Sequence, residues 1–293
     1  MDLSADLAGL VLDSTSTPEP VTRSCSGGSS IDWPRSLAVS YAMEATMVNV
    51  LADYTIPTHM HVLQWDLPAD AQADIEAHAR RCGFTLRQAY SLRRGCLKCA
   101  MGMKPFMSIP GQDQAKAETI AEAFELCVET FLRANVPAST VITTEAQRKQ
   151  HALASGTSPG PTPDFTLSPP VRINGRPVAW IDAKMLYASY TLRDKRFMPE
   201  SKMAATAHKY NFAFGPGAFV VCNGFCTALA REVPALMLDA SPLDTERLHA
   251  VIEGHCQVAT PLLSTEAMRT ALGLAERASV QKPKKKRNRR RNH

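Results

Sequence analysis

The 293-residue chain lacks any long apolar run. No stretch approaches the roughly 20 consecutive apolar residues that a membrane-spanning helix needs, so no membrane segment is predicted. The beginning of the chain also lacks the basic region and apolar stretch of a secretory signal. Asp2, Asp6 and Asp13 precede the first basic residue, which argues against a mitochondrial presequence. We therefore expect a soluble intracellular protein.

Net positive charge is lacking outside one short segment. The formal net charge is +5, but residues 281–293 contain eight lysines and arginines, so the remaining residues carry a net charge of −3. That charge is not typical of a generally basic nucleic-acid-binding protein. The tail is expected to be disordered and is typical of a nuclear localisation signal; a second interpretation is an arm with salt-sensitive, non-specific affinity for DNA. We expect the protein in the nucleus, with the cytoplasm as a second compartment.

The eight cysteines lack a zinc-ribbon arrangement. In an intracellular chain they are expected to be reduced thiols. Cys96 and Cys99 form a C-x-x-C pair, but no second pair and no paired histidines follow at the required spacing. We favour cysteines packed on a helix, with a zinc site as the alternative. Cys222 and Cys226 are expected in the core.

The apolar pattern divides the chain into five regions. Residues 1–35 are rich in Ser, Thr, Pro and Gly and are expected to be disordered. Residues 36–108 form a helical domain and residues 109–242 an α/β domain. Residues 243–280 contain closing helices, at 244–253 and 265–278, and residues 281–293 are the disordered basic tail.

Three helices are predicted within residues 36–108. Apolar residues recur at helical spacing from Ala38 to Leu51, a second helix opens at Pro68 and stops at Gly83, and a short basic helix covers residues 85–98. Two interpretations remain open for this domain. It is either a helix-turn-helix-like module that contacts DNA, or a helical cap with solvated arginines. The basic side chains concerned are Arg87, Arg93, Arg94 and Lys98.

The most informative segment is residues 162–184. Asp164 follows a proline and precedes a strand, Asn174-Gly175 is a strong hairpin signal, and a second strand ends in Asp182-Ala183-Lys184. Alternate side chains of a strand point to opposite faces, so Asp182 and Lys184 emerge on the same side. The preceding Val178–Ile181 run is β-prone and apolar, as a buried central strand should be.

The register of this hairpin decides whether the two aspartates meet. If Asn174-Gly175 alone forms the loop, regular pairing puts Asp164 and Asp182 on opposite faces. A three-residue loop that includes Arg176 would restore the shared face. A bulge at Pro169-Pro170, where proline interrupts the ladder, would do the same. We predict one of these two irregularities.

Two carboxylates and a lysine on one face are the groups that a Mg²⁺-dependent phosphodiester hydrolase needs. Asp164 and Asp182 would hold Mg²⁺, or Mn²⁺, with waters completing the octahedron. The ion would polarise the phosphate and lower the pKa of the attacking water. Lys184 would orient that water or stabilise the developing charge. The competing interpretation is a surface hairpin whose acids form ion pairs, but the neighbouring Trp180-Ile181 argues against exposure.

The segment resembles the PD-(D/E)xK nuclease superfamily and, more closely, its TPD-motif branch of codanin-interacting nucleases. The resemblance covers roughly residues 157–239 and rests on Thr162–Phe165, Val178–Lys184, Phe214–Ala218 and Asn223–Phe225, in that order. It implies an α/β fold with a restriction-endonuclease-like core, in which a mixed sheet flanked by helices follows the order α-β-β-β-α-β. It also implies a DNA-cutting hydrolase and, as the alternative function, a nuclear scaffold or adaptor that binds a codanin-like chromatin-assembly partner.

The helices of this core are predicted at residues 113–134 and 200–214. Glu118, Glu122, Glu125 and Glu129 form one acidic stripe on the first, which usually marks a solvated face. The resemblance implies that one glutamate of this helix joins the metal site; Glu125 matches best, with Glu122 as the runner-up. The second helix lacks the glutamine that the resemblance predicts.

The other strands are predicted at residues 141–144 and 217–223, with a flexible loop at 151–161. Predicted DNA contacts lie around the second core helix. Arg193, Lys195 and Arg196 belong to a basic segment that would line a DNA groove, or alternatively form a surface insertion. Lys202, His208 and Lys209 lie within the helix and are available for phosphate contact.

Overall fold

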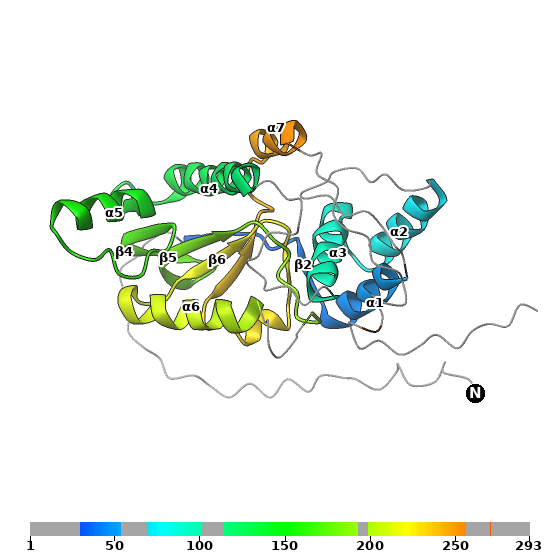
Figure 1. Ribbon diagram of the computed structural model, residues 1–293. Coiled ribbons are helices and arrows are strands. Elements are labelled where there is room, and N and C mark those ends of the chain that lie inside the picture. Colours follow the sequence, from blue (N-terminus) through cyan, green and yellow to red (C-terminus); the bar gives the residue numbers. More distant parts are fainter. Residues whose placement is uncertain (1–29, 54–68, 101–113, 193–198, 256–269, 271–293) are drawn as a thin grey trace, which may run out of the picture.

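The computed structural model describes residues 30–53, 69–100, 114–192, 199–255 and 270. Figure 1 shows a mixed β-sheet flanked by helices, with a group of three helices at one end. The sheet contains β1 (Ser30–Ile31), β3 (Val141–Thr144), β4 (Phe165–Ile173), β5 (Arg176–Lys184), β6 (Ala218–Val221) and β8 (Leu236–Asp239). This architecture confirms the predicted α/β class.

The sheet is antiparallel at the hairpin and parallel elsewhere. Its strand order is β1-β4-β5-β6-β8, and β3 also pairs with β4. The β3–β4 and β4–β5 pairs are antiparallel, while β1–β4, β5–β6 and β6–β8 are parallel. A separate small sheet pairs β2 (Ala38–Val39) with β7 (Phe225–Cys226), and a short 3₁₀ helix, η1 (Leu229–Arg231), follows.

Helices cover both faces of the sheet. α4 (Gln114–Asn135) lies on one face and α6 (Pro199–Phe214) on the other (Figure 1). β6 shows the reason, because all four of its side chains are buried. Ala218 and Val220 pack into the core cluster under α4, whereas Phe219 and Val221 pack into the cluster under α6. Such an apolar run is what a central parallel strand requires.

The remaining helices are α1 (Tyr41–Ala52), α2 (Ala69–Arg81), α3 (Leu86–Ala100), α5 (Glu145–Ala154) and α7 (Glu246–His255). α7 packs on α4, and its Leu248 and Ile252 join the core cluster of that face. It corresponds to the first closing helix; the second, at 265–278, and the basic tail lie outside the described residues. In the described part of the chain, no helix is long and apolar enough to cross a membrane.

The helical domain contains the three predicted helices, but its arginines are not displayed as expected. Arg93 of α3 is completely buried, so it is neither solvated nor presented to DNA. Arg87 donates to Nε2 of His249 on α7. Cys96 is fully buried in the core of this domain and Cys99 packs against it, which is the packing role that we favoured.

Two boundaries differ from the prediction. Residues 30–35 were expected to be disordered, but Ser30–Ile31 form β1 and Trp33 is buried, with its indole N–H donating to the Asp239 carbonyl. The predicted loop at 151–161 begins too early, because α5 continues to Ala154. α5 starts with a capping box between Thr144 and Gln147. This spacing of a threonine and a glutamine is a sequence signal for the start of a helix.

The segment after β5 is described only as far as Leu192. Tyr187, Ala188, Ser189 and Leu192 are buried against the helical domain or the α6 side of the sheet. The residues at the start of this segment therefore pack inward. The basic residues Arg193, Lys195 and Arg196 lie outside the described residues.

Candidate active site

The β4–β5 hairpin brings the two aspartates together. Asn174 and Gly175 form a two-residue turn with φ of 47° and 74°, and Ile173 pairs with Arg176. The register then shifts between Thr166 and Val171, which confirms the predicted bulge rather than a longer loop. Pro169 and Pro170 lie within the shift, where they cannot donate to the ladder.

Beyond the bulge, the register places the acids on one face. Phe165 pairs with Ile181, so Asp164 lies beside Asp182. The Ala183 N–H donates to Asp164 Oδ2 over 2.6 Å. Ala183 itself packs against the α4-side core, so its neighbours Asp182 and Lys184 point to the opposite side of β5.

Lys184 and Asp182 form an ion pair through Nζ and Oδ2. The Asp182 side chain is only 4% exposed, whereas that of Lys184 is 34% exposed. Apart from this ammonium group, no hydrogen-bond partner reaches the buried Oδ2 among the described residues. The Lys184 ammonium group therefore contacts Asp182, while part of the lysine side chain remains accessible to an incoming group.

The electrostatics of the cluster favour a cation. Burial, and then the negative charge of Asp182, raise the pKa of Asp164 to about 8. Burial would lower the pKa of Lys184, but the charges of Asp182 and Asp164 outweigh it and raise that pKa above its ordinary value. A neighbouring positive ion would relieve this suppressed ionisation of Asp164.

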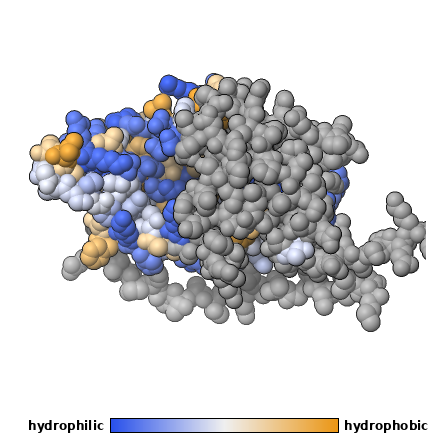
Figure 2. Space-filling view, viewed as in Figure 1, coloured by the Kyte–Doolittle hydropathy of each residue, from blue (hydrophilic) through white to orange (hydrophobic). Residues whose placement is uncertain are grey.

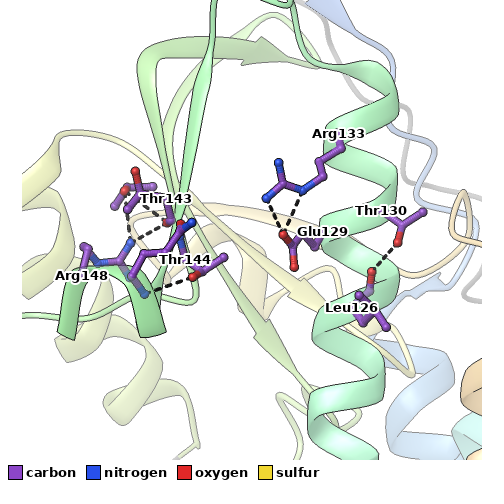
Figure 3. Close-up of polar contacts among 9 residues, drawn as sticks. Leu126, Glu129, Thr130, Arg133, Thr143, Thr144 and Arg148 are labelled. Atoms are coloured by element: carbon purple, nitrogen blue, oxygen red, sulfur yellow. Dashed lines mark hydrogen bonds and ion pairs between the residues drawn. The ribbon is translucent and has the colours of Figure 1, made fainter. Parts of the chain in front are cut away.

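Glu125 on α4 also senses this cluster. Its side chain is half-buried, and burial raises its pKa while the charge of Lys184 lowers it. Glu122, the runner-up, is exposed. Glu129 is paired with Arg133 over 2.6 Å, as Figure 3 shows. Of the acidic stripe, Glu125 is therefore the member coupled to the aspartates, although it comes from the helix on the other face of the sheet.

Arg148, on α5, holds the loop that carries Asp164. Its guanidinium donates to the Pro163 carbonyl, to the Thr143 carbonyl over 2.8 Å and to the Thr166 hydroxyl over 3.1 Å. Figure 3 shows Arg148 reaching back from the start of α5 to Thr143. One side chain thus ties together α5, β3, β4 and the residue before Asp164.

Glu145 and Tyr210 complete the support of this loop. The Glu145 N–H donates to the Asp164 carbonyl over 2.8 Å. Burial tends to raise the pKa of Glu145, but hydrogen bonds with the side chains of Thr162 and Lys149 bring it below its ordinary value. The Tyr210 hydroxyl donates to the Thr162 carbonyl over 3.2 Å. Burial, and then the charges of Asp182 and Asp164, raise the pKa of Tyr210.

The Phe214–Gly217 segment packs against Trp180, on the same face of β5 as Asp182 and Lys184. The indole N–H of Trp180 lies 3.0 Å from both Asn211 Oδ1 and the Gly215 carbonyl. A Cβ at Gly217 would lie 2.2 Å from the Trp180 ring, so only glycine fits there. The motif therefore packs the strand that ends in Asp182 and Lys184.

The donor set suits a hard divalent cation. Mg²⁺ is usually held by one or two carboxylates, with waters and substrate phosphates as its other ligands. Asp164 and Asp182 supply the two carboxylates. Within the residues that the structure describes, no three His, Cys, Asp or Glu side chains converge as a ligand set, so a cation here would take its remaining ligands from water, carbonyl or phosphate oxygens.

The structure brings Asp164, Asp182 and Lys184 into one cluster. Among the predicted DNA contacts, Arg193, Lys195 and Arg196 lie outside the described residues. Lys202 and Lys209 are exposed on α6. Sequence reasoning missed Arg148, Glu145 and Tyr210. The first two belong to a helix that was not predicted, and no local pattern marks the third.

Comparison with known proteins gives a matching family model for part of the chain, but no activity. Residues 103–240 match the family model described as "Protein of unknown function TPD sequence-motif". A TPD sequence-motif domain is thus present in this chain. The match contains both aspartates, Lys184 and the Phe214–Gly217 segment.

One relative extends the comparison beyond this chain. An uncharacterized protein of Acanthamoeba polyphaga mimivirus is 36% identical over 129 residues, which cover 42% of this chain and 41% of the viral protein. The similarity therefore spans about two fifths of each protein. No solved structure matches the chain significantly.

Proposed function

We propose that this TPD domain is a restriction-endonuclease-like, PD-(D/E)xK-type nuclease that uses Mg²⁺ or Mn²⁺ to hydrolyse phosphodiester bonds of DNA. The observation that carries the proposal is the meeting of Asp164, Asp182 and Lys184 on one side of β5, which depends on the bulge in β4. The resemblance of the surrounding motif gives independent support.

Each residue of the cluster has a distinct role in this proposal. Asp164 and Asp182 hold the cation, which when bound polarises the phosphate and acidifies the attacking water. Lys184, anchored on Asp182 and partly exposed, contacts a phosphate oxygen or the water and stabilises the charge that develops in the transition state. Glu125 adds negative charge to the cation site from α4.

The supporting residues act by position. Arg148, Glu145 and Tyr210 fix the backbone on either side of Asp164, and so keep its carboxylate in line with Asp182. The basic tail at 281–293 would direct the protein to the nucleus, where its substrate is found.

The test is metal-dependent cleavage by the full-length chain. Linear, flap and junction DNA would be incubated with Mg²⁺ or Mn²⁺, comparing the natural protein with Asp182→Asn and Lys184→Met. We expect each variant to reduce the cleavage rate by about 100- to 1,000-fold, as the loss of one transition-state contact does. Mn²⁺ binding, followed by magnetic resonance, should weaken in Asp182→Asn.

The matched control is Glu129→Gln, which neutralises an acid of α4 that is paired with Arg133 instead of coupled to the cluster. It should cleave like the natural protein. Unchanged cleavage by Asp182→Asn would refute the assignment. Metal binding without cleavage of any DNA would favour the scaffold function, in which a codanin-like partner is bound and hydrolysis is lost.

A further inference from the structure

The outer face of α6 carries a fully exposed aromatic ring. Phe212 is 95% exposed, more than the other large apolar side chains in the described part, of which Leu153 (83%) and Val141 (63%) come next. Burying a phenylalanine stabilises a fold by roughly 1.5–3 kcal/mol. Its position on the surface of α6 therefore gains no burial against the residues that the structure describes.

The surroundings of Phe212 are positive. With 3.6 residues per turn, the buried Met203 and Ala207 define the inner face of α6, and Phe212 lies nearly opposite. The exposed side chains of this outer face are Lys202, Ala205, His208, Lys209, Phe212 and Ala213. The sequence from residue 202 to 214 contains no acid. A complementary ligand is thus anionic and offers a flat apolar surface.

The candidate active site lies round α6 from this face, because residues two apart on an α-helix point about 160° away from each other. Tyr210, two residues before Phe212, donates to the Thr162 carbonyl and is close enough to Asp182 and Asp164 for their charges to affect it. Lys209 precedes Tyr210 on the helix surface. A strand that leaves the site across α6 meets Lys209 first and then Phe212, over a distance of about one helix diameter, roughly 10 Å.

The surface at this end of the molecule is mixed in hydropathy (Figure 2). Figure 2 shows hydrophobic groups set among hydrophilic surface at the end of the molecule where α5 and α6 lie in Figure 1. Aromatic side chains interspersed with cations are how proteins bind single strands: bases stack on the rings while cations follow the phosphates. A base paired inside a duplex cannot offer its face in this way.

We propose that the outer face of α6 binds an unpaired stretch of the nucleic-acid substrate, with a base stacked on Phe212 and flanking phosphates on Lys209 and Lys202. This inference rests on the proposed nuclease function and deepens it. The substrate class becomes DNA with a single-stranded segment next to the cleaved bond, such as a flap or a splayed junction, in preference to continuous duplex.

The test measures binding apart from cleavage. Full-length protein in EDTA, without a catalytic cation, would be titrated with a single-stranded oligonucleotide that contains 2-aminopurine and with a blunt duplex. Stacking contributes about 1–3 kcal/mol per base, so Phe212→Ala should weaken single-strand binding roughly 5- to 150-fold and abolish the stacking quench. Phe212→Trp should restore both, and blunt-duplex affinity should change less than about twofold.

Two further variants sharpen the result. Leu153→Ala, which removes an exposed apolar side chain from α5, should leave single-strand binding unchanged. Lys209→Gln should lower affinity for all sequences and reduce the salt dependence by about one phosphate contact. Phe212→Ala with unchanged affinity and quench would overturn the proposal. So would a loss of self-association or of a protein partner as its only effect, because α6 would then be a protein interface.

The two proposals fail separately. Cleavage that needs Asp182 but is indifferent to Phe212 would refute the α6 surface alone. Phe212-dependent binding without any metal-dependent cleavage would refute the nuclease and leave a single-strand-binding protein.

Discussion

Two carboxyl sites of this molecule, one in the helical domain and one on the sheet, differ in how completely their oxygens are hydrogen-bonded. Glu44 of α1 is fully buried, and both its oxygens are occupied: Oε2 accepts from the Tyr187 hydroxyl over 2.9 Å, and Oε1 accepts from the Ser189 hydroxyl over 2.8 Å and from the Thr191 N–H. This carboxylate joins α1 to the segment that follows β5. It is satisfied by donors from the chain.

Asp182 is buried and Asp164 is half-buried, both with less compensation. Asp164 Oδ2 accepts one backbone N–H, and Asp182 Oδ2 has the Lys184 ammonium. The two acids repel each other, which raises the pKa of Asp164 further after burial has raised it. The comparison teaches that a buried carboxylate with both oxygens hydrogen-bonded stabilises a fold, whereas a crowded pair with few donors keeps oxygens free for the cation that we propose.

Replacing Glu44 should have the largest effect on stability. Glu44→Ala leaves two hydroxyls and one backbone N–H without their acceptor, and unpaired buried donors cost about 1–3 kcal/mol each. We expect the free energy of unfolding to fall by about 3–5 kcal/mol, measured by urea denaturation. Asp182→Asn, the matched change at the other site, should cost far less or should stabilise the metal-free protein. Equal losses in the two variants would contradict the comparison.

Replacing Arg148 tests whether cleavage requires exact placement of the loop before Asp164. Arg148→Lys keeps the charge but cannot reach Pro163, Thr143 and Thr166 together, because lysine lacks the planar fork. Misplacement of a reacting group by about 1 Å costs on the order of 100-fold in rate, so we expect cleavage to fall about 10- to 100-fold. The discriminating readout is Mn²⁺ affinity, which should weaken as well.

A matched control for that change is Arg133→Lys on α4, where the partner is the surface acid Glu129. It should leave both cleavage and Mn²⁺ affinity unchanged. If Arg148→Lys lowered only the unfolding temperature, with normal rate and metal affinity in the folded protein, Arg148 would have no positioning role.

Asp164 should also give the stability of the protein a pH dependence. The folded-state pKa of Asp164, about 8, lies above its ordinary value of 3.8, so between these limits the folded protein retains a proton that the unfolded chain has released. The free energy of unfolding of the metal-free protein should therefore fall as the pH rises through this window, by at most about 1.4 kcal/mol per pH unit.

Urea denaturation in EDTA at about pH 5 and about pH 8 would measure this slope. Asp164→Asn should flatten it, and Mg²⁺ should restore stability at the higher pH by binding the ionised pair. A slope that is identical in the natural protein and in Asp164→Asn would show that this carboxyl does not titrate in the window.

The parts of the molecule that were predicted share a local signal. The hairpin turn, the need for an irregularity near Pro169-Pro170 and the shared face of Asp182 and Lys184 all follow from 23 consecutive residues, because period-two alternation and turn chemistry act over short range. The long amphipathic helix around Glu125 was predicted for the same reason.

The parts that were missed depend on contacts between distant residues. Trp33 exchanges backbone hydrogen bonds with the Asn174 side chain across 141 residues, and Glu44 meets Tyr187 across 143 residues. Residues 30–35 show no apolar periodicity that would predict a strand. The complete burial of Arg93 is contrary to the usual preference of arginine for the surface. No local pattern could reveal these partners.

The bulge in β4 has a second effect, on how the molecule meets copies of itself. The outer edge of β4 is covered by β3 along residues 165–168 and by β1 at residues 172 and 173. Between these two strands lie Pro169 and Pro170, which have no N–H to offer. Open strand edges are the usual starting point for intermolecular sheet growth, and β4 itself presents none; the open edges on this flank are those of the short strands β1 and β3. The same irregularity that aligns two acids thus also leaves the longest strand of this flank without an edge on which another chain could pair.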